Sequence, residues 1–148
     1  MKTQDKIKYS IRIQNLTDDQ RKSLSLLLHT RIEDIKNQNN KKETDNNVTK
    51  ITSISKPEIL MEELGAIYRK SESFLEPKTP VKEALFRFFI YNSNKPLTVK
   101  QISKQLSELW EMSQFPRDIG EEILSNLLKN ISDYYIQPYG RKFYIKKY

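Results

Sequence analysis

Three apolar patterns with helical spacing follow one another in the second half of the chain, and this run constrains the fold more than any other feature. Thr79 and Pro80 open the first pattern, "VKEALFRFFIY", and Thr98 opens the second, "VKQISKQLSELW". Pro116 opens the third, "RDIGEEILSNLLKN". Threonine before a first turn and proline within it are typical of helix starts. The apolar side chains that we expect to face inward from the third helix are Ile119, Ile123, Leu124, Leu127, Leu128 and Ile131.

The chain ends on "YYIQPYGRKFYIKKY", residues 134–148, which combines five tyrosines and one phenylalanine with four cationic side chains. Pro138 and Gly140 are typical turn residues, so two short strands are expected on either side, in "DYYIQ" and "KFYIKKY". Alternation along these strands turns roughly half of the aromatic side chains toward the core. The stretch can therefore be a core hairpin, a nucleic-acid-binding wing or a solvated tail.

Three helices followed by a two-stranded ribbon in residues 79–148 resemble a winged helix-turn-helix domain, the fold of many prokaryotic transcription regulators. The residues that carry the resemblance are "PLTVKQISKQL", "PRDIGEEILSNLLKN" and the terminal aromatic stretch. The resemblance implies that the third helix is the recognition helix and that residues 140–143 form the wing tip. The resemblance implies contacts to double-stranded DNA from Ser113, Gln114 and Arg117 of the third helix and from Arg141 and Lys142 of the wing. The charges themselves add Lys100 and Lys104 of the second helix and Lys146 and Lys147 of the terminal stretch as expected contacts.

The negative charge of the third helix argues against DNA binding by that helix. Residues 108–133 contain six carboxylates but only two cations, Arg117 and Lys129. Carboxylates are repelled by phosphates, so a helix this acidic is an unusual reader of the major groove. The alternative is a winged-helix adaptor that docks another protein through its acidic third helix.

The first periodic stretch lies near the N-terminus, where Ile7, Tyr9, Ile11 and Ile13 alternate with polar residues. A period of two predicts a strand with one buried face. Thr17 then stands where a helix N-cap is expected, followed by two aspartates that suit a first turn, and the helical pattern continues to about residue 36.

This strand and helix resemble the opening of a ribbon-helix-helix repressor over residues 7–36. In that family a dimer pairs two such strands, and the resemblance implies that Lys8, Ser10 and Arg12 read the major groove. The other interpretation is an ordinary strand whose polar side faces water. In either case an exposed strand needs a partner, so we expect homodimerisation through residues 7–14.

The sequence divides into four segments. The asparagine-rich stretch "NQNNKKETDNNVT" cannot bury enough apolar surface to become ordered, so it is interpreted as a flexible loop. Pro57 opens a helix that is expected to reach about Phe74, and the prolines of "EPKTP" mark a linker. The expected segments are a strand-helix region at 1–36, a polar loop at 37–50, a helix and linker at 51–78, and a winged-helix domain at 79–148.

Composition narrows the function. The net charge of +7 favours polyanionic partners, nucleic acid first. The chain has no cysteine, one histidine (His29) and three isolated glycines, so no thiolate chemistry, metal site or phosphate-cradling loop is expected. No apolar run is long enough to span a membrane, and the expected location is the cytoplasm. We therefore predict a mostly helical α+β protein without a cofactor, acting as a small non-enzymatic DNA-binding transcriptional regulator such as a repressor.

Overall fold

The computed structural model describes residues 7–39, 55–71, 74–76, 78–111, 120–130 and 134–139. Within these residues the chain is mostly helical with a small antiparallel sheet, so the predicted α+β class is confirmed. The described elements are β1 (Lys8–Ile11), the 3-10 helix η1 (Ile13–Asn15), α2 (Asp18–Asn39), α3 (Pro57–Lys70), α4 (Val81–Tyr91), β2 (Leu97–Thr98), α5 (Val99–Glu111), α6 (Glu121–Asn130) and β3 (Ile136–Tyr139).

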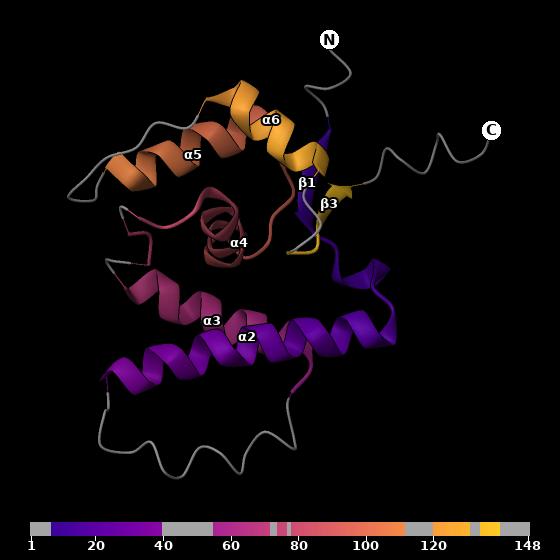
Figure 1. The fold of residues 1–148 in the computed structure, drawn as a ribbon, viewed down its shortest axis with the longest axis vertical. Helices are drawn as coiled ribbons and strands as arrows, with labels where there is room; N and C mark the ends of the chain where they lie inside the picture. Colours follow the sequence, from indigo (N-terminus) through magenta and orange to yellow (C-terminus); the bar gives the residue numbers. More distant parts are fainter. Residues whose placement is uncertain are drawn as a thin grey trace.

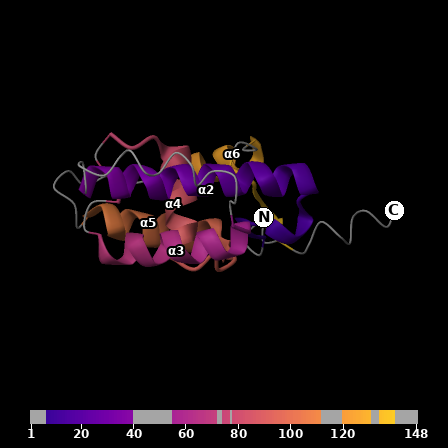
Figure 2. The ribbon, with the colours of Figure 1, turned by 90° about the horizontal axis from the view of Figure 1, so that it is seen from below.

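The helices are arranged in three layers. Figure 1 shows α2 and α3 at one side, α4 in the middle, and α5 and α6 at the other side, with the sheet next to α4. Seen from below in Figure 2, α2 and α3 run side by side in front of the other helices. The middle helix is apolar on nearly all sides, as expected for a helix covered from both directions.

Two helices begin with reciprocal hydrogen bonds between a threonine and a glutamine. At α2, Thr17 Oγ1 accepts from the Gln20 amide at 3.2 Å, and Gln20 Oε1 accepts from the Thr17 amide at 2.9 Å. At α5, Thr98 and Gln101 form the same pair of bonds, at 3.2 and 2.9 Å. In these capping boxes, side chains accept hydrogen bonds from backbone amides at the helix start, which have no carbonyl partner within the helix. Both predicted helix starts are confirmed.

A single buried core joins the segments that the sequence divides. Leu24, Leu28 and Ile32 of α2 recur every four residues and pack into the same cluster as Trp110 of α5 and Ile136 of β3. The described parts of three of the four expected segments, 1–36, 51–78 and 79–148, therefore share one core.

The sheet has the order β2-β1-β3, and β1 is its central strand. Tyr9 lies opposite Leu97 of β2, while Ile11 lies opposite Ile136 of β3. Where β2 ends, the side chain of Asn94 pairs with the backbone of β1 in place of a strand. Asn94 Oδ1 accepts a hydrogen bond from the Ile11 amide, and Asn94 Nδ2 donates one to the Ile11 carbonyl, both at 2.8 Å. Asn94 has a φ of 57°, a left-handed conformation that asparagine tolerates better than most residues.

This sheet corrects the expectation of dimerisation through residues 7–14. The prediction assumed a strand with a free edge. Both edges of β1 are instead occupied by strands of the same chain, so β1 cannot pair with a second copy without displacing β2 or β3. The strand is also shorter than expected, because the chain turns into η1 after Ile11.

The predicted C-terminal ribbon is corrected in part. Pro138 and Tyr139, expected in a turn, belong to β3, which pairs with β1. The amide and carbonyl of Ile11 point toward β2, and those of Tyr9, two residues earlier, point the same way. Pro138 lies opposite Tyr9 on the other side of β1, so its backbone nitrogen, which has no hydrogen, faces away from β1. A proline is therefore accommodated here. Residues 140–148, with the second expected strand, lie outside the described part.

Helix α3 ends at Lys70, four residues before the predicted limit near Phe74. Phe74 instead stacks between two other rings, at centroid distances of 5.2 Å to Tyr68 and 4.7 Å to Tyr91. Burying its ring in this stack requires the chain to leave the helix first. The predicted loop at 37–50 also begins later, because α2 continues to Asn39.

The bonds between Asn94 and Ile11 lead to a stability prediction. Asn94→Gly keeps the left-handed backbone accessible but leaves the buried amide and carbonyl of Ile11 unpaired, so it should lower the free energy of unfolding by about 2 kcal/mol. Asn94→Ala adds backbone strain and should lower it by about 3 kcal/mol. Urea denaturation followed by circular dichroism measures both. Ser93→Gly is the matched control, since Ser93 also has a positive φ of 60°. Equal stability of Asn94→Gly and Ser93→Gly would contradict this role.

Candidate nucleic-acid interface and the network behind it

Two of the predicted contact residues lie on the outer face of α5. Lys100 and Lys104 are one helical turn apart and both are exposed. The opposite face of the helix is fully buried through Ile102, Leu106 and Trp110. This amphipathic pattern fixes the rotation of α5, so that the two lysines face solvent together.

A third predicted contact joins them from the other end of the chain. Lys8 is exposed and lies directly opposite Thr98, the residue that caps α5. The backbone of Lys8 therefore lies next to the residue that caps α5. A helix N-terminus carries partial positive charge and amides without helical partners, so this end of α5 suits an anion.

A groove of about 570 Å³ lies between β1, α5 and α6. Ile7, Tyr9 and Val99 supply its apolar lining. Its charged lining is mixed, because Lys100 and Lys129 face the same space as Glu121 and Glu122. The acidic helix that the sequence raised as an objection to DNA binding thus lies next to the lysines, and it reduces the positive potential of this surface.

Helix α6 departs from the predicted orientation at one position. Leu124 and Leu128 are buried as expected, but Ile123 is 57% exposed. The prediction counted every apolar residue of the pattern as inward. Only the residues at a spacing of four reach the core, since an α-helix turns by about 100° per residue and Ile123 lies beside that stripe.

Burial also corrects two predicted readers in the N-terminal strand. Ser10 and Arg12 were expected to point outward with Lys8, but they are only 3% and 8% exposed. The expectation assumed a strand with one face in water, whereas the central strand of this sheet is covered on both faces beyond Lys8. The other predicted contacts lie outside the described residues: Ser113, Gln114, Arg117, Arg141, Lys142, Lys146 and Lys147.

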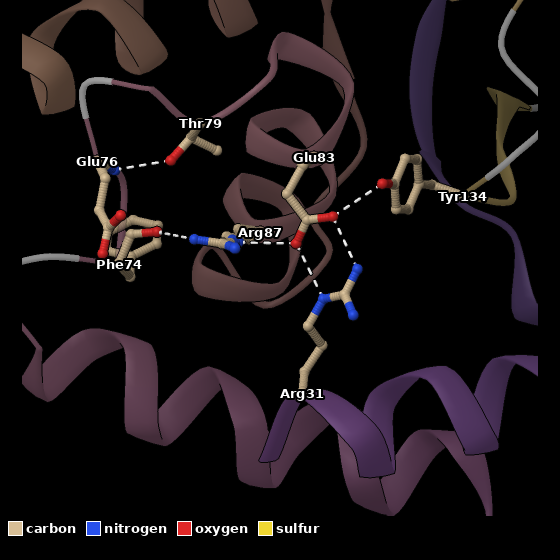
Figure 3. Close-up of polar contacts among 7 residues, drawn as sticks. All are labelled: Arg31, Phe74, Glu76, Thr79, Glu83, Arg87 and Tyr134. Carbon is tan, nitrogen blue, oxygen red and sulfur yellow. Dashed lines mark hydrogen bonds and ion pairs between the residues drawn. The ribbon is translucent and has the colours of Figure 1, made fainter. Parts of the chain in front are cut away.

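Behind this surface, a buried carboxylate joins distant parts of the chain (Figure 3). Glu83 of α4 accepts two hydrogen bonds from Arg31 of α2, at 2.8 and 2.9 Å. Arg87 Nε and the Tyr134 hydroxyl each donate to the same carboxylate at 2.8 Å. Arg87 also donates to the Phe74 carbonyl at 2.7 Å. The network ties α2 and the segment after α3 to α4 and to the turn that enters β3.

The pKa of Glu83 reflects these bonds. Burial by itself would raise the pKa, but the hydrogen bonds from Arg31, Arg87 and Tyr134 outweigh it and lower the pKa to about 2. Glu83 in turn raises the pKa of Arg31 through their hydrogen bonds. For Tyr134, burial and then the bond to Glu83 raise the pKa of the hydroxyl. At neutral pH the Glu83 carboxylate and the Arg31 guanidinium are therefore charged, and the Tyr134 phenol is neutral.

Other kinds of site were sought in the same residues. Across the described ranges, no three His, Asp or Glu side chains come together as a metal site. No helix in this part of the chain is both long and apolar enough to cross a membrane. Comparison with protein-family models, with curated proteins and with solved structures finds no match to this chain.

Sequence reasoning missed Lys129 and the partners of Glu83. Lys129 was counted only in the charge balance of its helix, although it comes to line the groove with Lys100. Glu83 was noted as a first-turn carboxylate, which is a local role. The local signals were its position within a helix that is apolar on most sides and the cation four residues later, Arg87, since its other partners are 52 and 51 residues away.

The network predicts a specific loss of stability in acid. The pKa of Glu83 is lower in the folded protein than its ordinary value of 4.5, so its contribution is complete above about pH 4.5 and disappears as the pH falls toward 2. Glu83→Gln should lower the free energy of unfolding at neutral pH by about 3 kcal/mol and flatten its pH dependence in that interval. Denaturation at a series of pH values measures this. Glu62→Gln, at an exposed position of α3, is the control; the same pH dependence in both variants would contradict the assignment.

Proposed function

We propose that the protein is a non-enzymatic transcriptional regulator that binds double-stranded DNA through Lys8, Lys100 and Lys104. The observation that carries the proposal is the pairing of Lys8 with Thr98, the residue that caps the helix of Lys100 and Lys104. Lys8 and the two lysines of α5 come from segments far apart in the sequence, and each was singled out by a separate sequence pattern. Cations next to a helix N-terminus suit backbone phosphates.

The charge of the whole chain supports the same partner. The net charge is +7, and four cations stand among the last eight residues, including Arg141 and Lys142. Each phosphate neutralised by a lysine or arginine releases counterions, which makes such binding strongly dependent on salt. In this proposal the C-terminal cations form a second set of contacts, and the helix-turn-helix of the winged-helix resemblance provides the first.

Glu121 and Glu122 have a structural explanation that is compatible with DNA binding. They occupy the first turn of α6, where carboxylates interact favourably with the helix dipole. Their role in starting the helix accounts for the acidic charge without a protein partner. A homodimer, if it forms, would use a surface other than the edges of β1.

The proposal is tested by gel mobility shift on duplex DNA over a range of salt concentrations. Lys100→Glu/Lys104→Glu should weaken binding about tenfold and reduce the salt slope by about 1.8, which is 0.9 for each lost phosphate contact. The control variant Lys22→Glu/Lys56→Glu changes the net charge by the same amount as Lys100→Glu/Lys104→Glu, but at exposed residues of α2 and just before α3. That control should retain most of the affinity. No binding by the unaltered protein at low salt would refute the proposal.

A second function, docking of another protein through α6, is favoured by the exposure of Ile123. This large apolar side chain lies beside the exposed Glu121 and Glu122, a combination that suits a partner with an apolar contact and basic neighbours. Glu121→Lys/Glu122→Lys separates the two functions. DNA binding should stay equal or become stronger, because two repulsive charges are reversed, whereas weaker DNA binding with the fold intact would favour the adaptor.

A further inference from the structure

A second cavity lies among α2, α3, the segment that follows α3, and the middle of α4. Its volume is about 610 Å³, within the usual range for sites that bind small molecules. The walls come from Arg31 of α2, Tyr68 of α3, Phe74 and Glu76 of the following segment, and Arg87 of α4. Figure 3 shows four of these residues around the Glu83 network.

Two guanidinium groups are held in fixed positions at this cavity. Arg31 Nε and Arg87 Nε both donate to Glu83 Oε2, at 2.9 and 2.8 Å, which places the groups side by side. The described bonds of each arginine use two of its five N–H donors. Their side chains are 23% and 24% exposed, so the remaining donors are not sealed from solvent.

One carboxylate between two guanidiniums leaves a net positive charge at the base of the cavity. Asp34 and Glu76 also line the cavity, but both are exposed, so water screens their charges more than that of the buried network. Lys70 adds a further exposed cation at the rim. The ligand that these charges favour is an anion with planar or multiple oxygens, since a guanidinium pairs best with carboxylate or phosphate groups.

The remaining wall is aromatic. Tyr68 stacks on Phe74, with an interplanar angle of 27°, and both rings line the cavity. Burial raises the pKa of Tyr68 to about 12, so its hydroxyl is neutral at physiological pH. Tyr68 and Tyr91 cover the two faces of the Phe74 ring, which leaves its edge for an edge-to-face contact with another ring.

From this combination we propose that the cavity binds a small aromatic anion, whose phosphate or carboxylate group contacts Arg31 and Arg87 and whose ring packs against the edge of the Phe74 ring. The cavity is close to an internal reporter. The indole nitrogen of Trp110, the single tryptophan of the chain, donates to the Glu76 carbonyl at 3.4 Å. A ligand that shifts the segment carrying Glu76 therefore alters the surroundings of Trp110. The binding site stands independently of the proposed DNA function.

Phenyl phosphate is a suitable probe, because it carries both parts of the proposed ligand. Titration followed by tryptophan fluorescence and by calorimetry should show one saturable site with a Kd in the range of about 1 mM or tighter. Inorganic phosphate should bind more weakly because it lacks the ring, and phenol should not bind detectably because it lacks the charge.

Rim variants of opposite sign test the location without breaking the Glu83 network. Lys70→Glu should weaken phenyl phosphate binding about fivefold, and Asp34→Asn should strengthen it about twofold, as expected for adding and removing a partly screened charge. Lys22→Glu and Asp19→Asn are matched controls at exposed positions of α2 that do not line the cavity, and they should bind like the unaltered protein.

Three results would overturn the proposal. The first is the absence of saturable binding up to about 10 mM phenyl phosphate. The second is equal binding of phenol, which would remove the arginines from recognition. The third is an equal loss in Lys70→Glu and Lys22→Glu, which would show general attraction to a basic protein instead of a site.

Discussion

The position of Glu83 is the constraint on which the rest of the structure depends. A carboxylate in the interior of a helix that is buried on most sides is unfavourable unless its oxygens are fully paired. Arg31, Arg87 and Tyr134 provide that pairing, and each comes from a different part of the fold. Meeting this one requirement places α2 against α4 and fixes the turn that leads into β3. The central position of β1 has the same effect at the other end of the core, because it joins the N-terminal strand to β2 and β3.

The two proposed sites differ in their electrostatics. Lys8, Lys100 and Lys104 are exposed, and Glu121 and Glu122 line the groove that Lys100 lines, so the surface proposed for nucleic acid is of mixed charge. The cavity lined by Arg31 and Arg87 combines fixed guanidiniums with aromatic rings, a combination that suits a small anion. Trp110 of α5 donates a hydrogen bond to the carbonyl of Glu76, a residue of the cavity wall, so the helix that carries Lys100 and Lys104 contacts the segment that lines the cavity.

Local signals in the sequence were sufficient for much of the fold. Thr17 and Thr98 predicted helix starts because a capping box depends on residues only three apart. The outward position of Lys100 followed from helical spacing. What could not be predicted depends on pairing across long distances in the sequence. Strand β3 pairs with β1, near the other end of the chain, and Pro138 fits a strand because its N side, which lacks a hydrogen, faces away from that partner. Ser10 and Arg12 were predicted to be exposed for the same reason. The alternation of apolar and polar residues shows that a strand has two faces, but not whether other parts of the protein cover both of them. Of the partners of Glu83, Arg87 lies four residues away on the same helix, but no local pattern points to Arg31 or Tyr134.

Native-state hydrogen exchange tests the central claim, that the N-terminal strand and the C-terminal helices form one cooperative unit. The amides of Ile11 and Arg12, which donate to Asn94 and Tyr135, should exchange with the same free energy of opening as the Leu106 amide of α5. Urea should lower these free energies in parallel, as expected for global unfolding. Exchange of the β1 amides through a low-energy local opening, while the α5 amide remains protected, would show that β1 is an accessory strand and would contradict the account.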